Sequence, residues 1–571
     1  MKTITHQLDA AFRQAISTAF PGTPDVDPLI GPSQNEKFGD YQSNVAMGLA
    51  KRVSLKPREV AEKVTAAVQP ILRELASEVG IAGPGFINVR LSPQWVAHQL
   101  DVIRRDERLA VELTEKPQTV VLDYSSPNIA KEMHIGNMRA TVIGDAIRRV
   151  LEFRGERVIP QNHVGDWGTA FGMLLAYLKE NADRADAPIK DIEQFYKAAK
   201  KRFDADPAFA NESRQAVVRL QSGSAEELAR WQRIIELSRQ HLDEMYAVLG
   251  IKLTRADERG ESFYNPLLAD VVKELSEKGI AVESEGAIVV WVQGFEAPLI
   301  VRKSDGGFGY GATDLAAVRY RARDLKADRI ITLTDHRQSQ HFKQFSDAAR
   351  RAGWLDGVSF EHVTFGAIMG PDGKPYKTKS GETVKLGDVV NEAVERALVI
   401  VTEKNPEIPE ESRKTVARAV GVGAIKYYDM VRDRATDYVF DWEKMLSFDG
   451  NTAPYLQYAN ARICSIFRKA GVDRNNVSAP INLESTFELA LGKHLLRFGE
   501  IIESVTRELK PHVLTTYLYD LATRFSGFFE NCPVIQSDEP VRASRLALCD
   551  ATARTLACGL DLLGIEHPEQ M

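Results

Sequence analysis

Residues 119–161 carry the pattern that most limits how this chain can fold. The run "TVVLDYS" (119–125) is almost continuously apolar, as expected for a strand that is covered on both faces. Apolar residues then recur at helical spacing between Gly136 and Phe153, Gly155 offers a helix stop, and "RVIPQNHVGDWG" predicts a second strand and loop. A strand, loop, helix and strand within about 45 residues form a βαβ unit, so we predict a parallel sheet.

The rest of the chain divides around this unit. Helical patterns in residues 1–112, followed by "GIAGPGFINVRLS" read as one strand, predict an α+β domain that ends at the polar stretch "ELTEKPQ". Residues 113–384 predict a parallel-sheet domain of Rossmann type, with a largely helical insertion near 175–300. Strand signals almost vanish beyond 385, so residues 385–571 predict an all-α helical bundle. The expected fold class is therefore α/β with an α+β domain before it and a helical bundle after it.

Composition excludes several classes of protein. No apolar run approaches the ~18 residues that span a bilayer, and the first 20 residues predict an amphipathic helix, so we expect neither a membrane span nor a signal peptide. Cys464, Cys532, Cys549 and Cys558 form no CxxC pair, which argues against a metal site and suits reduced cysteines of a cytoplasmic protein. With a net charge of −6, a nucleic-acid partner would need local basic surfaces.

The turn from Ser125 to Asn137 is the first candidate site. It follows the carboxyl end of a predicted parallel strand, where ligands bind in open sheets, and it leads into a helix N-terminus, which favours anions. Lys131 and His134 can donate to phosphate oxygens, and Gly136 allows a ligand to approach the backbone. This pattern predicts a nucleotide-phosphate pocket, although it does not match the GxxxxGK[ST] loop. The alternative is a structural turn with an incidental histidine.

The second candidate is the loop "GPDGKPYKTKSG". It carries Lys374, Lys377 and Lys379 among Gly, Pro and Asp, and such a loop is a sensible clamp for a polyphosphate, where catalysis depends on positioning and charge stabilisation. A solvated surface loop is the alternative interpretation and the commoner one for lysine-rich segments.

These motifs carry a family resemblance. "HIGN" resembles the HIGH motif of class I aminoacyl-tRNA synthetases, and "YKTKSG" resembles a degenerate KMSKS loop. Five longer segments, in order along the chain, resemble arginyl-tRNA synthetases of the bacterial type: "SSPNIAKEMHIGNMR", "NHVGDWGTAFGMLL", "ATDLAAVRYR", "DHRQSQHF" and "FDGNTAPYLQYANAR". The resemblance runs from "FGDYQSNVAM" to the C-terminal "LGIE".

The resemblance implies an enzyme that uses ATP, with Mg²⁺, to form arginyl-adenylate and then arginyl-tRNA. It implies that His134 contacts the ATP phosphates, that Gly136 lies under the adenine, and that Asn137 occupies the position of the second HIGH histidine. Because the KMSKS spelling is lost, the charge on the phosphates falls either to Lys131, three residues before the histidine, or to Lys377 and Lys379.

For the amino acid, the resemblance implies a Tyr310 and Asp314 pair that receives the guanidinium, with further contacts from Asn128 and Gln338. A planar carboxylate suits a guanidinium. Read alone, Asp314 also fits a helix N-cap before "LAAVRYRA", and the two roles are compatible.

For the tRNA, the resemblance implies that residues 1–112 bind the elbow and residues 385–571 the anticodon. Phe86 is the candidate to stack on a D-loop base and Asn88 to hydrogen-bond it, although Phe86 also fits a strand core. Tyr455 and Tyr458 are candidates for the anticodon surface. The implied partners are tRNA(Arg), L-arginine and ATP, and we expect a monomer in the cytoplasm.

Three rival functions stay open at this point. A small-molecule adenylyltransferase on the same core would not need the long helical C-terminus. A synthetase-like protein that binds RNA without catalysis would be expected to lose His134 or Asp314, and both are present. A cysteine-specific synthetase would be expected to have thiolate zinc ligands, and the cysteine spacing offers none.

Overall fold

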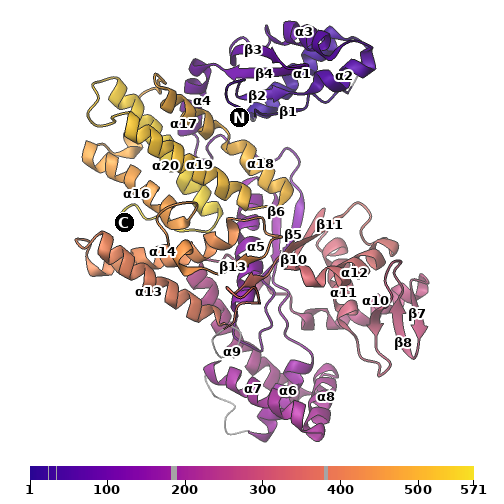
Figure 1. The fold of residues 1–571 in the computed structure, drawn as a ribbon. Coiled ribbons are helices and arrows are strands. Elements are labelled where there is room, and N and C mark those ends of the chain that lie inside the picture. Colours follow the sequence, from indigo (N-terminus) through magenta and orange to yellow (C-terminus); the bar gives the residue numbers. More distant parts are fainter. Residues whose placement is uncertain (24, 34, 182–188, 378–383) are drawn as a thin grey trace.

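A computed structural model describes residues 1–571 except 24, 34, 182–188 and 378–383. Its first part is an α+β domain with an antiparallel sheet in the order β1-β2-β4-β3, covered by three helices. The strands are β1 (Ile30–Pro32), β2 (Tyr41–Ser43), β3 (Ala76–Ala82) and β4 (Phe86–Leu91), and the helices are α1 (Ile4–Ala19), α2 (Val45–Val53) and α3 (Pro57–Val68). Helix α4 (Pro93–Arg105) follows and contacts the C-terminal helices (Figure 1).

The prediction of one strand across "GIAGPGFINVRLS" was wrong. The segment contains the end of β3, a turn, and β4, which pair antiparallel with Ala82 opposite Phe86. Gly83 and Gly85 have φ values of +56° and +150°, backbone conformations that glycine adopts readily, and they flank Pro84. The turn was hidden because apolar and polar residues alternate in both strands of the hairpin.

The central sheet is parallel throughout, which confirms the predicted fold class. Its strand order is β11-β10-β5-β6. The strands are β5 (Thr119–Asp123), β6 (Arg157–Gln161), β10 (Arg329–Asp335) and β11 (Ser359–Phe365). Helix α5 (Ile135–Phe153) connects β5 to β6, as the sequence predicted. Helices α11 (Tyr310–Arg323) and α12 (Ser339–Arg351) belong to a second apolar core beside the sheet, and the short η4 (His336–Gln338) joins β10 to α12.

Along the chain, a helical block and a small antiparallel sheet are inserted between strands β6 and β10. The block contains α6 (Thr169–Glu180), α7 (Ile189–Ala205), α8 (Pro207–Gln221) and α9 (Ala225–Leu249), and lies at the bottom of Figure 1. It is followed by the 3₁₀ segments η2 (Arg255–Asp257) and η3 (Glu261–Leu267), α10 (Leu268–Glu277), and the sheet β7 (Ala281–Ser284), β8 (Ala287–Val290) and β9 (Leu299–Arg302).

The remainder is almost entirely helical and forms the orange and yellow part of Figure 1. Its longer helices are α13 (Leu386–Lys404), α14 (Glu410–Met430), α16 (Ala453–Ala470), α17 (Thr486–Leu496), α18 (Phe498–Glu508), α19 (His512–Asn531) and α20 (Val541–Leu562). The short elements are β12 (Ile368–Met369), which pairs with β13 (Tyr438–Val439), and α15 (Trp442–Met445) and η5 (Arg474–Asn476). We keep 1–112, 113–384 and 385–571 as proposed domain boundaries. Within the described ranges, no helix is both long and apolar enough to cross a membrane.

Helix α5 lies unusually close to the central sheet. Tyr124, directly after β5, is fully buried, and a Cβ atom placed on Gly144 of α5 would lie 2.4 Å from three atoms of the Tyr124 side chain. The absence of a side chain at Gly144 therefore sets how closely α5 approaches the sheet.

We expect Gly144→Ala to destabilise the fold. Alanine favours a helix interior by about 1 kcal/mol over glycine, but overpacking against a fully buried ring costs about 1–3 kcal/mol. The thermal unfolding midpoint should therefore fall. The matched control is Gly48→Ala in α2, where an added Cβ meets nothing within 4 Å, and its midpoint should stay or rise. An unchanged midpoint for Gly144→Ala would mean that α5 shifts freely on the sheet.

Candidate active site

The turn after β5 has a strained backbone held by hydrogen bonds. Ser125 and Ser126 both lie in the left-handed region, with φ values of 71° and 46°. The Ser126 N–H donates to Asn162 Oδ1 at 2.9 Å, and Ser126 Oγ donates to Asp123 Oδ1 at 2.9 Å. Ser125 Oγ shares hydrogen bonds with Thr141 Oγ1 and with the Tyr246 hydroxyl. Non-glycine residues in this region persist only where their surroundings fix them, and such strain concentrates at functional sites.

The "HIGN" residues form the first turn of α5. His134 is the N-cap, and its N–H donates to Asn137 Oδ1 at 3.0 Å, so this asparagine caps the helix. Burial, and then the nearby Lys131, lower the pKa of His134, which keeps the imidazole neutral at pH 7. A neutral imidazole has one N–H to donate and one nitrogen to accept. The Ile135 N–H donates to the Val384 carbonyl at 3.0 Å, which joins the end of the lysine loop to this turn.

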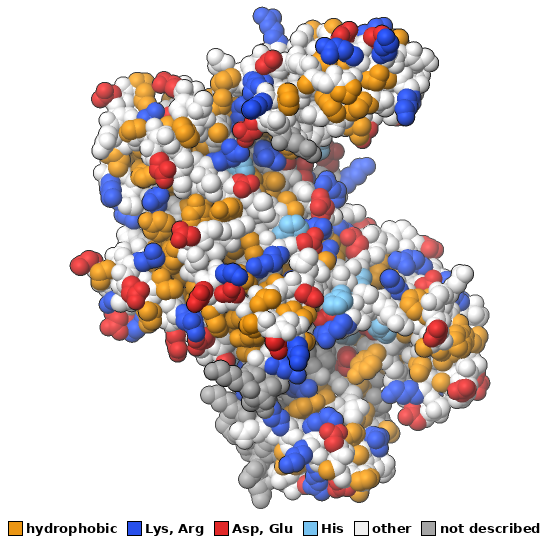
Figure 2. Space-filling model, in the orientation of Figure 1, with side chains coloured by type: hydrophobic (Ala, Val, Ile, Leu, Met, Phe, Trp, Pro, Cys, Tyr) orange, Lys and Arg blue, Asp and Glu red, His pale blue; other side chains and the backbone are white. Residues whose placement is uncertain are grey.

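One cavity of about 710 Å³ lies at the carboxyl ends of β5 and β10. The predicted site residues that line it are His134, Gly136, Asn137, Tyr310, Asp314 and Gln338. It is also lined by residues that the sequence analysis did not select, among them Glu261, His163, His341 and Phe342. On the face of the molecule that Figure 2 shows, acidic and basic side chains are interspersed rather than gathered into one basic surface.

Two carboxyl groups, Asp314 near the start of α11 and Glu261 at the start of η3, line the cavity. Asp314 Oδ2 lies 2.5 Å from His341 Nε2, and both side chains are partly exposed. Burial, with Asp166 and Asp314 nearby, raises the pKa of Glu261 to about 8. Burial, Glu261 and Asp314 also raise the pKa of Tyr310. Two carboxyl groups and a phenol on one cavity suit a planar cation with several N–H donors.

A buried ion pair forms the floor beneath these groups. Arg321 donates to Asp123 Oδ2 at 2.8 Å and to Gln161 Oε1 at 2.7 Å, and both charged side chains are almost fully buried. The pair joins α11, β5 and β6, and thereby fixes the helix that carries Tyr310 and Asp314 against the strand ends.

Among the described residues that were predicted to bind ATP or arginine, three do not line the cavity. Asn128 is exposed, and its Oδ1 accepts from the Ala130 N–H at 3.0 Å. The Lys131 ammonium lies over the Tyr196 ring of α7, 4.3 Å from its centroid. Lys377 is exposed in the lysine loop, and Lys379 falls outside the described residues.

The candidate RNA contacts differ in accessibility. Phe86 is half-buried, whereas Asn88 is only 4% exposed inside the sheet, where its Nδ2 donates to the Phe86 carbonyl at 3.4 Å. Tyr455 packs near Tyr519. Tyr458 is 42% exposed and lines a separate cavity of about 610 Å³ that also includes Arg462, Phe529 and Met571.

Sequence signals for the missed residues were unequal. His341 stands inside the quoted segment "DHRQSQHF", so the sequence marked it as a candidate. Its contact with Asp314 becomes visible only in the folded structure. Glu261 stands in "GESFYNP", a segment with no recognisable pattern, and its chemistry comes from burial.

Comparisons with known proteins agree along the whole chain. Residues 6–91 match the arginyl tRNA synthetase N-terminal domain, residues 99–442 the catalytic domain of the class I (R) tRNA synthetases, and residues 456–571 the DALR anticodon binding domain. The arginine–tRNA ligase of Cellvibrio japonicus is 52% identical, with 96% of this chain and 97% of that protein covered, and that of Laribacter hongkongensis is 48% identical over both full lengths.

Solved structures lead to the same family. The arginyl-tRNA synthetase of Plasmodium falciparum matches the whole chain with a TM-score of 0.88 at 31% identity, and that of Thermus thermophilus with 0.84 at 27%; each is also covered in full. From the site geometry and these matches together, we conclude that the chain belongs to the arginyl-tRNA synthetases.

Proposed function

We propose that this chain activates L-arginine with ATP, releasing pyrophosphate, and transfers the arginyl group to the 3′ end of tRNA(Arg). One observation carries the assignment to this cavity. The "HIGN" turn, suited to phosphates, and the Asp314 and Glu261 carboxyl groups, suited to a guanidinium, line the same space. The activation step needs both substrates in one cavity, because the arginine carboxylate attacks the α-phosphorus while the bond to pyrophosphate breaks.

In this proposal the guanidinium of arginine binds between Asp314 and Glu261. His341 orients the Asp314 carboxylate, and Tyr310 on the preceding turn of α11 covers the side chain. Gln338 and Asn128 are proposed to contact the backbone end of the amino acid. Because Asn128 is exposed and engaged with its own turn, its contact requires the side chain to rotate.

The ATP phosphates are proposed to lie at the first turn of α5. Neutral His134 donates one hydrogen bond to a phosphate oxygen, and Gly136, which is exposed, leaves room for the adenine. Asn137 acts here through the cap that orients His134. Lys131, Lys377 and Lys379 are the candidate cations for the charge that develops on the pyrophosphate.

We expect Mg²⁺ to arrive with ATP. The described residues contain no group of three or more His, Cys, Asp or Glu side chains arranged to hold a metal ion, so phosphate oxygens would supply most of its ligands. Phe86, Asn88, Tyr455 and Tyr458 remain our proposed tRNA contacts, and a monomer in the cytoplasm remains the expected state.

Charging of purified tRNA with each amino acid in turn tests the overall function, and Asp314→Ala tests the pocket. We expect charging with arginine alone. Loss of one partner of a bidentate charge pair costs about 3 kcal/mol, so the arginine KM of Asp314→Ala should rise about 100-fold or charging should vanish. Asp324→Ala, an exposed acidic residue at the end of the same helix, is the control and should charge normally. Unchanged arginine kinetics in Asp314→Ala would place the guanidinium elsewhere.

The raised pKa of Glu261 predicts a pH dependence of arginine use. A carboxyl with a pKa of about 8 is neutral below that pH and ionised above it, and only the ionised form pairs with a guanidinium. The kcat/KM for arginine reports the free enzyme and should rise between about pH 6.5 and pH 8.5. Glu261→Gln should be lower throughout and should lose this rise. A rise that persists in Glu261→Gln would assign the titration to another group.

We expect Lys131, which stands three residues before His134, to be the lysine that acts on the phosphates. If Lys131 leaves Tyr196 to reach the pyrophosphate, it acts on charge that develops in the transition state, and its loss typically costs ~10² to 10³ in rate. Lys131→Ala should therefore lower kcat while the arginine KM stays nearly constant, and Lys377→Ala and Lys379→Ala should be milder. A wild-type kcat in Lys131→Ala, with a loss in Lys379→Ala, would return the role to the loop.

A further inference from the structure

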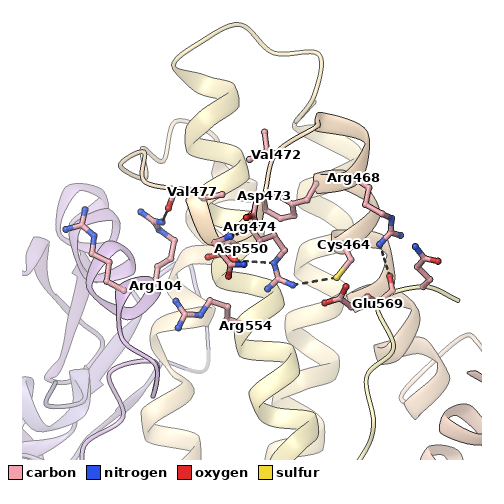
Figure 3. A pocket seen from close by; sticks show the side chains of 14 residues that line it. Arg104, Cys464, Arg468, Val472, Asp473, Arg474, Val477, Asp550, Arg554 and Glu569 are labelled. Carbon is pink, nitrogen blue, oxygen red and sulfur yellow. Dashed lines mark hydrogen bonds and ion pairs between the residues drawn. The ribbon is translucent and has the colours of Figure 1, made fainter. Parts of the chain in front are cut away.

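A second cavity, of about 810 Å³, lies far along the chain from the active site and shares no lining residue with it. It is bordered by the end of α4, the C-terminal half of α16, the η5 segment, α20 and the last residues of the chain (Figure 3). Neither the sequence motifs nor the proposed aminoacylation reaction uses it.

The cavity is rich in guanidinium groups. Five arginines among the described residues line it: Arg104, Arg105, Arg468, Arg474 and Arg554. Arg105 and Arg468 are exposed at the mouth, whereas Arg474 and Arg554 are partly buried and Arg104 is almost fully buried. The arginines come from four separate segments, so the fold, and not one basic stretch of sequence, brings them together.

The carboxylates that line the cavity balance only part of this positive charge. Asp550 pairs with Arg474 at 3.3 Å, and Asp473 accepts hydrogen bonds within its own turn, from the Asn475 N–H at 3.0 Å. The third carboxylate, Glu569, is exposed. Five arginines and three carboxylates leave a net charge of +2 on the lining.

The remaining guanidinium groups donate largely to backbone carbonyls. Arg468 donates to the Glu569 carbonyl at 3.2 Å, Arg554 to the Asp106 carbonyl at 3.0 Å, and Arg104 to the Ala479 carbonyl at 3.1 Å as well as to the Val477 carbonyl. Arg104 is also 3.4 Å from Asp101, which lies outside the lining. A carbonyl satisfies an N–H group without cancelling its charge, so the cavity keeps a positive potential that attracts anions.

The shape of the lining narrows the class of anion. Arginines placed around a volume of this size suit a ligand with several phosphate groups, each able to accept paired hydrogen bonds from a guanidinium. Phe467, the aromatic residue in the lining, is buried, and the Arg474 guanidinium lies 5.8 Å above its ring. A base therefore finds no free ring for stacking, which disfavours an RNA base or a nucleoside as the group recognised.

We infer that this cavity binds a small oligophosphate anion that bridges α4 to the C-terminal bundle. The exposed Arg105 and Arg468 would contact the entering anion first, and the partly buried Arg554 would donate hydrogen bonds to it deeper in the cavity. Because α4 is the last helix of the N-terminal domain, a bound anion would hold that domain more firmly on the bundle.

Isothermal titration of the full chain with inorganic tripolyphosphate tests the inference. The active site is first filled with a sulfamoyl analogue of arginyl-adenylate, which carries no phosphate group, so that remaining binding reports a second site. With its active site filled in this way, wild type should bind one tripolyphosphate per chain. Arg105→Gln should weaken this binding at least tenfold, and Arg105→Gln with Arg554→Gln should abolish it. Since the structure gives no hydrogen bond for the exposed Arg105 among the described residues, its replacement should not disturb folding.

The control is Arg418→Gln, an exposed arginine of α14 outside the cavity, which should bind as wild type does. The inference fails if wild type with a filled active site binds no tripolyphosphate, or if the double variant binds tripolyphosphate as tightly as wild type does. It also fails if the double variant binds tripolyphosphate as wild type does but has a raised KM for tRNA, because the arginines then contact the RNA backbone. Arginine charging by the double variant should stay at the wild-type level, so the outcome does not depend on the proposed function.

Discussion

The ion pair between Arg139 and Asp429 is the contact on which the catalytic helix and the C-terminal bundle both depend. Arg139 lies in the second turn of α5, two residues after Asn137, and its Nε is 2.9 Å from Asp429 Oδ1 of α14, with both side chains almost fully buried. Its other nitrogens donate to the carbonyls of Thr436 and Arg434, at 3.1 and 3.2 Å. Burial raises the pKa of Asp429 even beside this cation. Removing one partner of such a pair costs about 3–5 kcal/mol, because the other charge stays buried. The pair therefore couples the bundle to α5, the helix whose N-cap is His134.

A second set of contacts fixes the turn on the other side of α5. Tyr246 of α9 hydrogen-bonds both Ser125 and Asn162, so the helical block between β6 and β10 supports the strained turn directly. The buried Lys426 ammonium of α14 donates to the Leu249 carbonyl at the end of α9 and to the Gly564 carbonyl after α20. Burial lowers the pKa of Lys426 to about 8. Two helix C-termini, each with a negative dipole end, thus meet one cation, which connects the insertion, the bundle and the active-site turn.

Sequence periodicity predicted those parts of the molecule that are set by local burial, and failed where distant segments decide. The β5–α5–β6 unit was readable because strand and helix impose different spacings on their apolar residues. The β3–β4 hairpin was not, because alternation continues through both strands. Asp314 could be placed from its motif, but its partner His341 is 27 residues away. The pKa of Glu261 is raised only because the fold buries this side chain beside Asp166 and Asp314. Lys131 was predicted to face phosphate. In the structure its ammonium lies over the ring of Tyr196, a residue of α7 more than sixty positions later in the chain.

In the proposed binding mode, the carboxyl groups of the cavity also give a physical reason for choosing arginine. A buried Glu261 with a raised pKa holds its proton while the pocket is empty, so the free site avoids placing two negative charges side by side. A guanidinium stays charged at any physiological pH and presents donors in a plane, so its arrival favours ionisation of Glu261 while Asp314 is held by His341. A lysine ammonium is a compact, strongly hydrated point charge and cannot serve two carboxylates with paired, coplanar hydrogen bonds. Discrimination then follows from the carboxylate acceptors that the wrong amino acid leaves unpaired.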